Sequence, residues 1–325
     1  MRRVATAVVG AMLLAACGGT ADTTEGRPQT ERPQIVVTTS ILGDLVSSVV
    51  GGDAAVEVIL PVGADPHGFA PSASQASSFR EADLVVANGL GLEEGLTSAL
   101  GAAEEDGVRV FNATDHVDLI ELGEHEAEDE HADEDEHADE EGEGAHGHGD
   151  EDPHIWFDPA RMASVVDALG LELAAVDDTV DWQARAAGVA ADLTDLDEEI
   201  RQQVQGLPED RRVLVTNHEV LGYFADAYDF ELAATLIPGG STLAEPSAAD
   251  LTDIIAIVAE TGVPAIFGET TAGSRIAEVV ADEAGTDIQV VELYTESLSD
   301  PDGPAGTYID MMRTNATRIV EALSA

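Results

Sequence analysis

The sequence predicts an α/β protein with two lobes, each a roughly four-stranded parallel sheet flanked by helices, joined by one long rigid helix. Three observations support this class. Short β-branched runs alternate with amphipathic helical stretches from Gln34 onward, and this order requires crossover connections and parallel sheets. The runs form two groups along a chain of 325 residues, a length that indicates roughly two domains. A long apolar stripe with helical spacing separates the two groups.

The chain begins with features of a secreted lipoprotein. Met1-Arg2-Arg3 gives a positive start, and the apolar run at 4–16 is too short to cross a bilayer but fits a secretory signal. The run ends at Cys17 in a sequence that resembles a bacterial lipobox, in which this Cys is acylated; an ordinary signal peptide with an incidental Cys is the alternative. We therefore expect a signal peptide at 1–17, a flexible tether at 18–33 and lipid anchoring outside the cytoplasmic membrane, at the cell surface or in the periplasm.

Eight strands are expected. In an N-terminal lobe predicted at 34–177 they are Ile35–Thr39, Val56–Leu60, Leu84–Ala87 and Val108–Phe111. In a C-terminal lobe predicted at 208–325 they are Val213–Thr216, Leu232–Thr235, Ala265–Gly268 and Ile288–Leu293. Helices are predicted between them, including Ala248–Thr261, Ser274–Gly285 and Tyr308–Leu323.

A linking helix is predicted at 178–207. Its apolar residues recur at steps of three and four, which marks one buried stripe: Trp182, Ala186, Val189, Leu193, Leu196, Ile200 and Val204. Gly206 and Pro208 provide a stop signal at its end. The helical pattern from Trp182 to Val204 alone extends about 35 Å, enough to bridge two lobes stiffly.

The segment 121–152 differs from the rest of the chain. It contains 17 carboxylates, no basic residue and five His: His125, His131, His137, His146 and His148. With few apolar residues it cannot offset the entropy of ordering, so we predict a disordered loop that offers weak secondary metal sites.

The charge balance excludes several partners. There are 65 Asp and Glu against 14 basic residues, all of them Arg, which gives a formal net charge of −51. Binding of nucleic acid depends on basic residues that neutralise phosphates, so no nucleic acid is expected, and docking through basic patches on anionic lipid is equally excluded. The single Cys excludes a disulfide framework and a thiolate zinc cluster. We expect a monomer.

Three His share a context that suits metal binding. His67 and His154 each end an Asp-Pro-His tripeptide, and His218 follows a strand directly. Ligands of α/β proteins bind beyond the carboxyl ends of strands, where these residues are expected to meet. Pro restricts the backbone before each of the first two His, and the neighbouring Asp can hydrogen-bond the imidazole and fix its tautomer. Three imidazoles and a carboxylate suit Zn²⁺; both Glu269 and Glu296 follow strands, and spacing does not choose between them.

These motifs resemble the zinc- and manganese-type metal-binding lipoproteins that serve as solute-binding proteins of ABC importers. The resemblance covers essentially the whole mature chain and rests on four ordered motifs: Asp65-Pro66-His67 with Phe69 and Pro71-Ser72, Asp152-Pro153-His154-Ile155-Trp156 with Asp158-Pro159, Asn217-His218-Glu219 with Gly222-Tyr223-Phe224, and Leu293-Tyr294-Thr295-Glu296-Ser297-Leu298.

The resemblance implies two lobes on one long helix, with a metal held between them by His67, His154, His218 and Glu296. The family usually carries Asp where this chain has Glu296, which leaves Glu269 or water as alternatives for the fourth ligand. It also implies delivery of the metal to a membrane permease and, through that permease, work with a cytoplasmic ATPase.

Zinc is the predicted cargo, because three imidazoles favour Zn²⁺ over metals that prefer oxygen donors; Mn²⁺ and Fe²⁺ are the alternatives. An extracytoplasmic zinc buffer or chaperone would not need ligands from two lobes. A zinc hydrolase would need an open coordination position, which four protein ligands close. The sequence therefore predicts a transport receptor and no enzyme activity.

Overall fold

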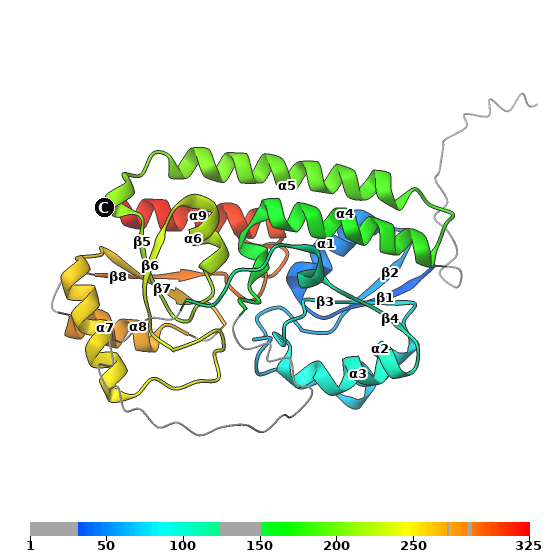
Figure 1. The fold of residues 1–325 in the computed structure, drawn as a ribbon, viewed down its shortest axis with the longest axis horizontal. Helices are drawn as coiled ribbons and strands as arrows, with labels where there is room; N and C mark the ends of the chain where they lie inside the picture. The colour runs from blue at the N-terminus through cyan, green and yellow to red at the C-terminus, as the bar shows by residue number, and fades with distance from the viewer. Residues whose placement is uncertain (1–31, 124–150, 272, 285–287) are drawn as a thin grey trace, which may run out of the picture.

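The computed structural model describes residues 32–123, 151–271, 273–284 and 288–325 (Figure 1). Two parallel sheets of four strands are present in these ranges, with strand orders β2-β1-β3-β4 and β6-β5-β7-β8. Helices flank both sheets. The predicted α/β class with two lobes is therefore confirmed.

Each sheet takes its strands from one part of the chain. The first consists of β1 (Gln34–Val37), β2 (Ala55–Val58), β3 (Leu84–Ala87) and β4 (Arg109–Asn112). The second consists of β5 (Val213–Thr216), β6 (Glu231–Thr235), β7 (Ala265–Glu269) and β8 (Gln289–Leu293). Every predicted run overlaps its strand. Thr39, predicted to end the first strand, instead caps the next helix, because its Oγ1 accepts a hydrogen bond from the backbone N of Leu42 at 3.3 Å.

The helices lie between and beside the strands. They are α1 (Ser40–Val50), α2 (Ala73–Glu81), α3 (Thr97–Glu105), α4 (Pro159–Val176), α5 (Trp182–Val204), α6 (Gly222–Tyr228), α7 (Ala248–Thr261), α8 (Arg275–Glu283) and α9 (Tyr308–Leu323). The bounds of α7 and α9 agree with those predicted. The predicted helix at Ser274–Gly285 is shorter in the structure, and Gly285 lies outside the described residues.

Helix α5 runs along both lobes, as Figure 1 shows. It packs most extensively against α4 and also contacts α1 and α9. Its predicted apolar stripe is buried apart from Val189, which is partly exposed. Gly170 of α4 permits this packing, because a Cβ there would lie 2.5 Å from Cβ of Ala186. The helix is thus part of the core as well as a connector.

One large cluster of buried apolar side chains joins the two lobes. It includes residues of both sheets together with α1, α4, α5 and α9. Two smaller clusters lie one in each lobe, on the other side of each sheet. Because cores pack densely, the shared cluster holds the lobes together on the side of these helices.

The opposite side of the shared core is where strand ends from the two lobes face each other. In each sheet the strand order reverses between two central neighbours, β1 and β3 in the first and β5 and β7 in the second. Ligands of open parallel sheets bind at such positions, beyond the carboxyl ends of the strands. A ligand site is therefore expected in the loops that follow these strands.

The acidic segment begins and ends at one point of the structure. Glu121 and Glu151 form an isolated antiparallel bridge, and the backbone N of Asp152 donates to the carbonyl O of Ile120 at 2.9 Å.

The predicted domain boundaries at 34–177, 178–207 and 208–325 stay predictions. Within the described part of the chain, no helix combines the length and the apolar character needed to cross a membrane.

The packing of α4 on α5 generates a test with a matched control. Gly170→Ala should lower the free energy of unfolding by about 1–3 kcal/mol, because the added methyl overpacks the interface. Gly188→Ala in α5 should raise it by about 0.5–1 kcal/mol, since nothing lies within 4 Å of that position and Ala favours a helix. Urea denaturation monitored by circular dichroism measures both. Equal effects of the two substitutions would contradict the close helix approach.

Candidate metal centre

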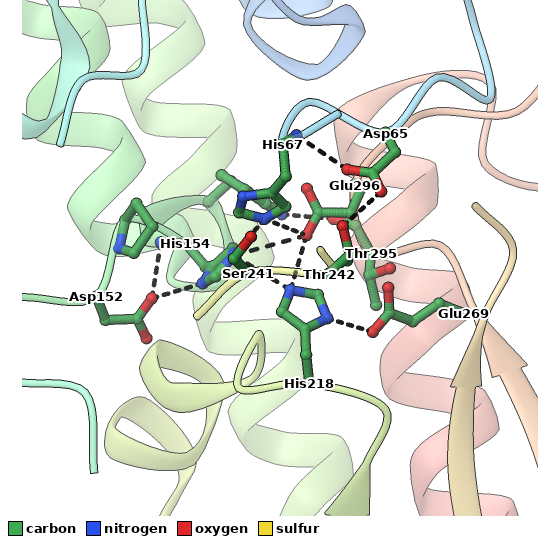
Figure 2. Close-up of polar contacts among 12 residues, drawn as sticks. Asp65, His67, Asp152, His154, His218, Ser241, Thr242, Glu269, Thr295 and Glu296 are labelled. Carbon is green, nitrogen blue, oxygen red and sulfur yellow. Dashed lines mark hydrogen bonds and ion pairs between the residues drawn. The ribbon is translucent and has the colours of Figure 1, made fainter. Parts of the chain in front are cut away.

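Four buried side chains from distant parts of the chain meet between the lobes (Figure 2). His67, His154, His218 and Glu296 each offer one ligand atom, and these atoms all lie within 4.8 Å of one another. Nε2 of His154 is 3.4 Å from Nε2 of His67 and 3.3 Å from Nε2 of His218. Oε1 of Glu296 is 3.2, 3.6 and 3.8 Å from the same atoms of His218, His154 and His67. The structure therefore brings together the set that the sequence resemblance implied.

Strand ends explain how these residues converge. His67 lies in the loop after β2, His218 comes shortly after β5, and Glu296 follows β8. His154 precedes a 3₁₀ turn at Ile155–Phe157 that leads into α4. Since the strands within each sheet are parallel, their carboxyl ends lie on one edge, and the two edges face each other.

Two carboxylates fix the orientation of two imidazoles. Oδ1 of Asp152 lies 2.7 Å from Nδ1 of His154, and Oε1 of Glu269 lies 2.5 Å from Nδ1 of His218. Each Nδ1–H donates to its carboxylate, which leaves Nε2 free to coordinate a metal toward the centre. Glu269, one of the two candidates for the fourth ligand, thus lies behind His218, while Glu296 lies against the three Nε2 atoms.

The two Asp-Pro-His tripeptides have different contacts. Asp152 accepts hydrogen bonds from both the backbone N and the ring of His154. Asp65 accepts only from the backbone N of His67, at 2.9 Å, and its other oxygen accepts from Oγ1 of Thr242 at 2.5 Å. The expected fixing of the imidazole by the neighbouring Asp therefore holds for His154 and is wrong for His67, because Asp65 bonds across to another loop.

The loop that carries His154 is held by buried hydrogen bonds to its backbone. Tyr223 Oη donates to the carbonyl O of Asp152 at 2.9 Å, and Tyr308 Oη donates to that of Trp156 at 2.8 Å. Trp156 donates its indole N–H to the carbonyl O of Thr295 at 2.8 Å. Asn88 Nδ2 donates to the carbonyl O of Pro153 at 2.8 Å.

Sequence reasoning missed these anchors. Buried aromatic residues such as Tyr223 indicate core packing, and nothing in the pattern names the partner of the hydroxyl group. Asn88 directly follows β3, and its place beyond a strand end is the signal that could have drawn attention to it.

The electrostatics of the pocket favour a bound cation. Burial lowers the pKa of His218, but the Glu269 and Glu296 carboxylates outweigh it and raise that pKa to about 10. Burial would raise the pKa of Glu296, yet the neighbouring His218, His67 and His154 hold it below its ordinary value. Among the described residues, no hydrogen bond with good geometry reaches either carboxylate oxygen of Glu296. A buried carboxylate in this state is costly, and a cation at the centre would offset that cost.

The donor set suits a divalent transition metal. Three imidazole nitrogens and one carboxylate oxygen form a common tetrahedral arrangement for Zn²⁺. All four side chains are nearly inaccessible to solvent, between 0% and 3% exposed. Four protein ligands would enclose an ion completely, so the arrangement is suited to holding a metal rather than activating water on it.

Other predicted residues lie elsewhere or outside the described ranges. Cys17 and the loop residues His125, His131, His137, His146 and His148 are outside the described part of the chain. The prediction of a disordered loop at 121–152 is wrong at its two ends, because Glu121 pairs with Glu151 and Asp152 is buried against His154. The rest of that segment, 124–150, lies outside the described residues. His116 is in the first lobe and stacks on Phe111, with ring centroids 4.5 Å apart.

Comparisons with known proteins agree with this site. Residues 35–322 match the family described as "ZnuA: Zinc-uptake complex component A periplasmic". The manganese-binding lipoprotein MntA of Halalkalibacterium halodurans is 31% identical over 98% of this chain and 96% of its own length. The zinc-binding protein TroA of Treponema pallidum is 30% identical over 90% of this chain and 89% of its own length.

A solved structure shares the fold. The periplasmic zinc-binding protein TroA from Treponema pallidum superimposes with a TM-score of 0.77 at 29% identity, covering 90% of this chain and 99% of that protein. The similarity extends over both lobes, so the two-lobe architecture is common to both proteins.

The raised pKa of His218 predicts an unusual pH dependence of metal affinity. Below about pH 10 a proton competes with the metal for this imidazole. Metal affinity should therefore increase as the pH is raised, by up to about tenfold per pH unit, even between pH 7.0 and 8.5. In Glu269→Gln the rise should be shallower over this range, because a neutral amide stabilises the imidazolium less. Competition with a chelator of known pH dependence measures both proteins. A wild-type affinity that is constant above pH 7 would contradict the assignment.

Proposed function

This chain belongs to the family of periplasmic zinc-uptake complex component A proteins, and we propose that the cargo it carries within that family is Zn²⁺. It is the solute-binding protein of a metal ABC transporter and acts outside the cytoplasm. It works with a permease and an ATPase, as solute-binding proteins of ABC importers do, and it is not an enzyme.

The observation that supports zinc is the donor set of the site. Three Nε2 atoms and a single carboxylate converge, and His154 and His218 are held by carboxylates in the tautomer that a metal requires. Manganese prefers sites richer in oxygen, whereas borderline nitrogen donors suit zinc. We accordingly assign His67, His154, His218 and Glu296 as the four ligands of the cargo ion.

Manganese is the second candidate, and two observations favour it. A relative that is 31% identical is named a manganese-binding lipoprotein. Both oxygens of Glu296 are buried and lack a well-formed hydrogen bond among the described residues, so both are able to coordinate, which would add an oxygen donor. The metal that the purified protein retains decides between these two cargoes.

The enclosure of the site explains why a receptor is favoured over a hydrolase. The four side chains leave no coordination position for a reactive water. Ligands contributed by both lobes allow the ion to be released when the lobes separate. A carrier that delivers an intact ion to a permease requires both properties.

Two further proposals concern the N-terminus and the acidic segment. We propose that Cys17 is acylated and tethers a monomer to the outer side of the cytoplasmic membrane through residues 18–33. We also propose that the five His of 121–152 bind additional metal weakly, because a chain without its own core loses conformational entropy on closing around an ion.

Removal of any one imidazole tests the ligand assignment. Zinc affinity should fall by more than about 100-fold in each of three variants, His67→Ala, His154→Ala and His218→Ala. Loss of a residue that only orients a metal ligand already lowers metal affinity by about 10- to 100-fold, and these residues are the ligands themselves. His116→Ala is the matched control and should bind as the wild type does, since its ring stacks on Phe111 away from the centre. Chelator competition measures the affinities. Wild-type affinity in all three variants would overturn the site.

The identity of the cargo is tested by competition between metals. Apoprotein dialysed against equimolar Zn²⁺ and Mn²⁺ should retain about one zinc ion per chain, measured by plasma mass spectrometry on protein lacking 124–150 so that the loop His do not contribute. Retention of manganese would contradict zinc as the cargo and leave the family membership unchanged.

The lipid anchor is tested in a bacterial host that processes lipoproteins. The wild type should incorporate labelled fatty acid and partition with membranes, whereas Cys17→Ser should incorporate none. Fatty-acid label on Cys17→Ser, or an unlabelled wild type, would contradict acylation at this residue.

A further inference from the structure

The three imidazoles of the site are not held equally. His154 and His218 each have a carboxylate on Nδ1. Within the part of the chain that the structure describes, no carboxylate lies within ion-pair distance of Nδ1 of His67. The imidazole ring of His67 has a carboxylate within that distance at Nε2, where Glu296 lies 3.8 Å away. His67 is therefore positioned by its loop, and what holds that loop decides where the ligand lies.

Three of the four proposed ligands are tied to the second lobe. His218 and Glu296 follow β5 and β8 of the second sheet. The loop of His154 receives hydrogen bonds from Tyr223 and Tyr308 and donates one to Thr295, all of the second lobe. Asn88 binds the same loop from the first lobe. His67, in the loop after β2, reaches the centre from the side opposite His218 (Figure 2).

One segment of the second lobe reaches across to the loop of His67. We call residues 238–246 the crossing segment. Just before this segment, Ile237 N donates to the carbonyl O of Asn217 at 2.7 Å. Near its start, the carbonyl O of Gly239 accepts from Glu219 N at 3.4 Å. These two bonds hold the beginning of the crossing segment beside His218. Gly239 has a φ of +82°, a conformation that favours glycine.

The crossing segment contacts the first lobe through its side chains. Thr242 Oγ1 donates to Asp65 Oδ2 at 2.5 Å in a partly buried position. Ser241 Oγ donates to Glu94 Oε1 at 3.3 Å in an exposed position. Both bonds are made to a carboxylate, and the Thr242 bond is the stronger of the two because it is shorter and less hydrated. Asp65 uses its other oxygen to accept from the backbone N of His67, so one side chain connects Thr242 with the ligand's own backbone.

We propose that Thr242 is a positioning residue that latches the His67 loop to the second lobe, so that His67 closes the metal site last and leaves it first. This inference rests on the proposed metal site. The latch holds the lobes together on the side away from the shared core of α1, α4, α5 and α9. Opening the Thr242–Asp65 bond releases the Asp65 side chain that holds the backbone of His67, while the start of the same loop stays attached where Gly63 N donates to Ser297 Oγ at 2.8 Å. Departure of His67 then leaves the ion on His154, His218 and Glu296, from which it departs more readily.

The test uses zinc and measures rates. In Thr242→Val the dissociation rate into excess chelator should rise about tenfold or more, as expected for the loss of a hydrogen bond to a charged group. The association rate should change little, because the first three ligands remain. Thr242→Ser keeps the hydroxyl and should restore slow dissociation. Thr252→Val in α7, whose hydroxyl donates to Ala248 O within its own helix, is the matched control and should behave as the wild type does.

A double-mutant cycle shows whether the effect passes through His67. In the His67→Ala background the Thr242→Val substitution should no longer accelerate dissociation, because the ligand that it positions is absent. Wild-type dissociation in Thr242→Val would overturn the latch, and an equal acceleration in both backgrounds would overturn its connection to His67. A wild-type protein that binds no zinc is a separate result, which would remove the proposed cargo and with it this inference.

Discussion

The burial of Glu296 among three imidazoles is the constraint on which the rest of the structure depends. A carboxylate that is 2% exposed and lacks well-formed hydrogen bonds among the described residues is costly unless positive charge accompanies it. The Glu269 and Glu296 carboxylates raise the pKa of His218 to about 10, so a proton on His218 supplies that charge in the metal-free protein. A divalent cation supplies it better, and it binds in exchange for the proton. The same arrangement thus tolerates the metal-free state and favours the loaded one.

The surrounding structure serves to keep the imidazoles in one orientation. Asp152 and Glu269 each hold an Nδ1–H, and buried aromatic hydroxyl and indole groups hold the backbone of the His154 loop. A preorganised set of donors loses little entropy on binding, which increases affinity without additional contacts. Such a site would release its ion slowly if every ligand were equally fixed. The looser attachment of His67 provides a route for release.

The two lobes are joined in different ways on their two sides. On one side a continuous apolar core runs through α1, α4, α5 and α9, and Gly170 lets α4 and α5 approach closely. On the other side polar contacts, including the Thr242–Asp65 bond, connect the crossing segment with the first lobe. Dense apolar packing resists deformation, whereas single hydrogen bonds exchange readily with water. The core is therefore the fixed side of the molecule, and the crossing segment is the side able to open.

Local patterns in the sequence determined the α/β class, the eight strands and the three His of the site. Strand runs such as Leu84–Ala87, the helical stripe of α5 and the Asp-Pro-His tripeptides depend on residues close together in the chain, so each can be recognised without knowing what it packs against. The choice between Glu296 and Glu269 could not be made from spacing, because both lie at or beyond the carboxyl ends of parallel strands. Only the packing of β7 beside β5 places Glu269 on Nδ1 of His218. The carboxylate of Asp152 accepts hydrogen bonds from the nearby His154, whereas the different contacts of Asp65 depend on a partner far along the chain. Thr242 lies 177 residues from Asp65, and only the approach of the two lobes brings them together.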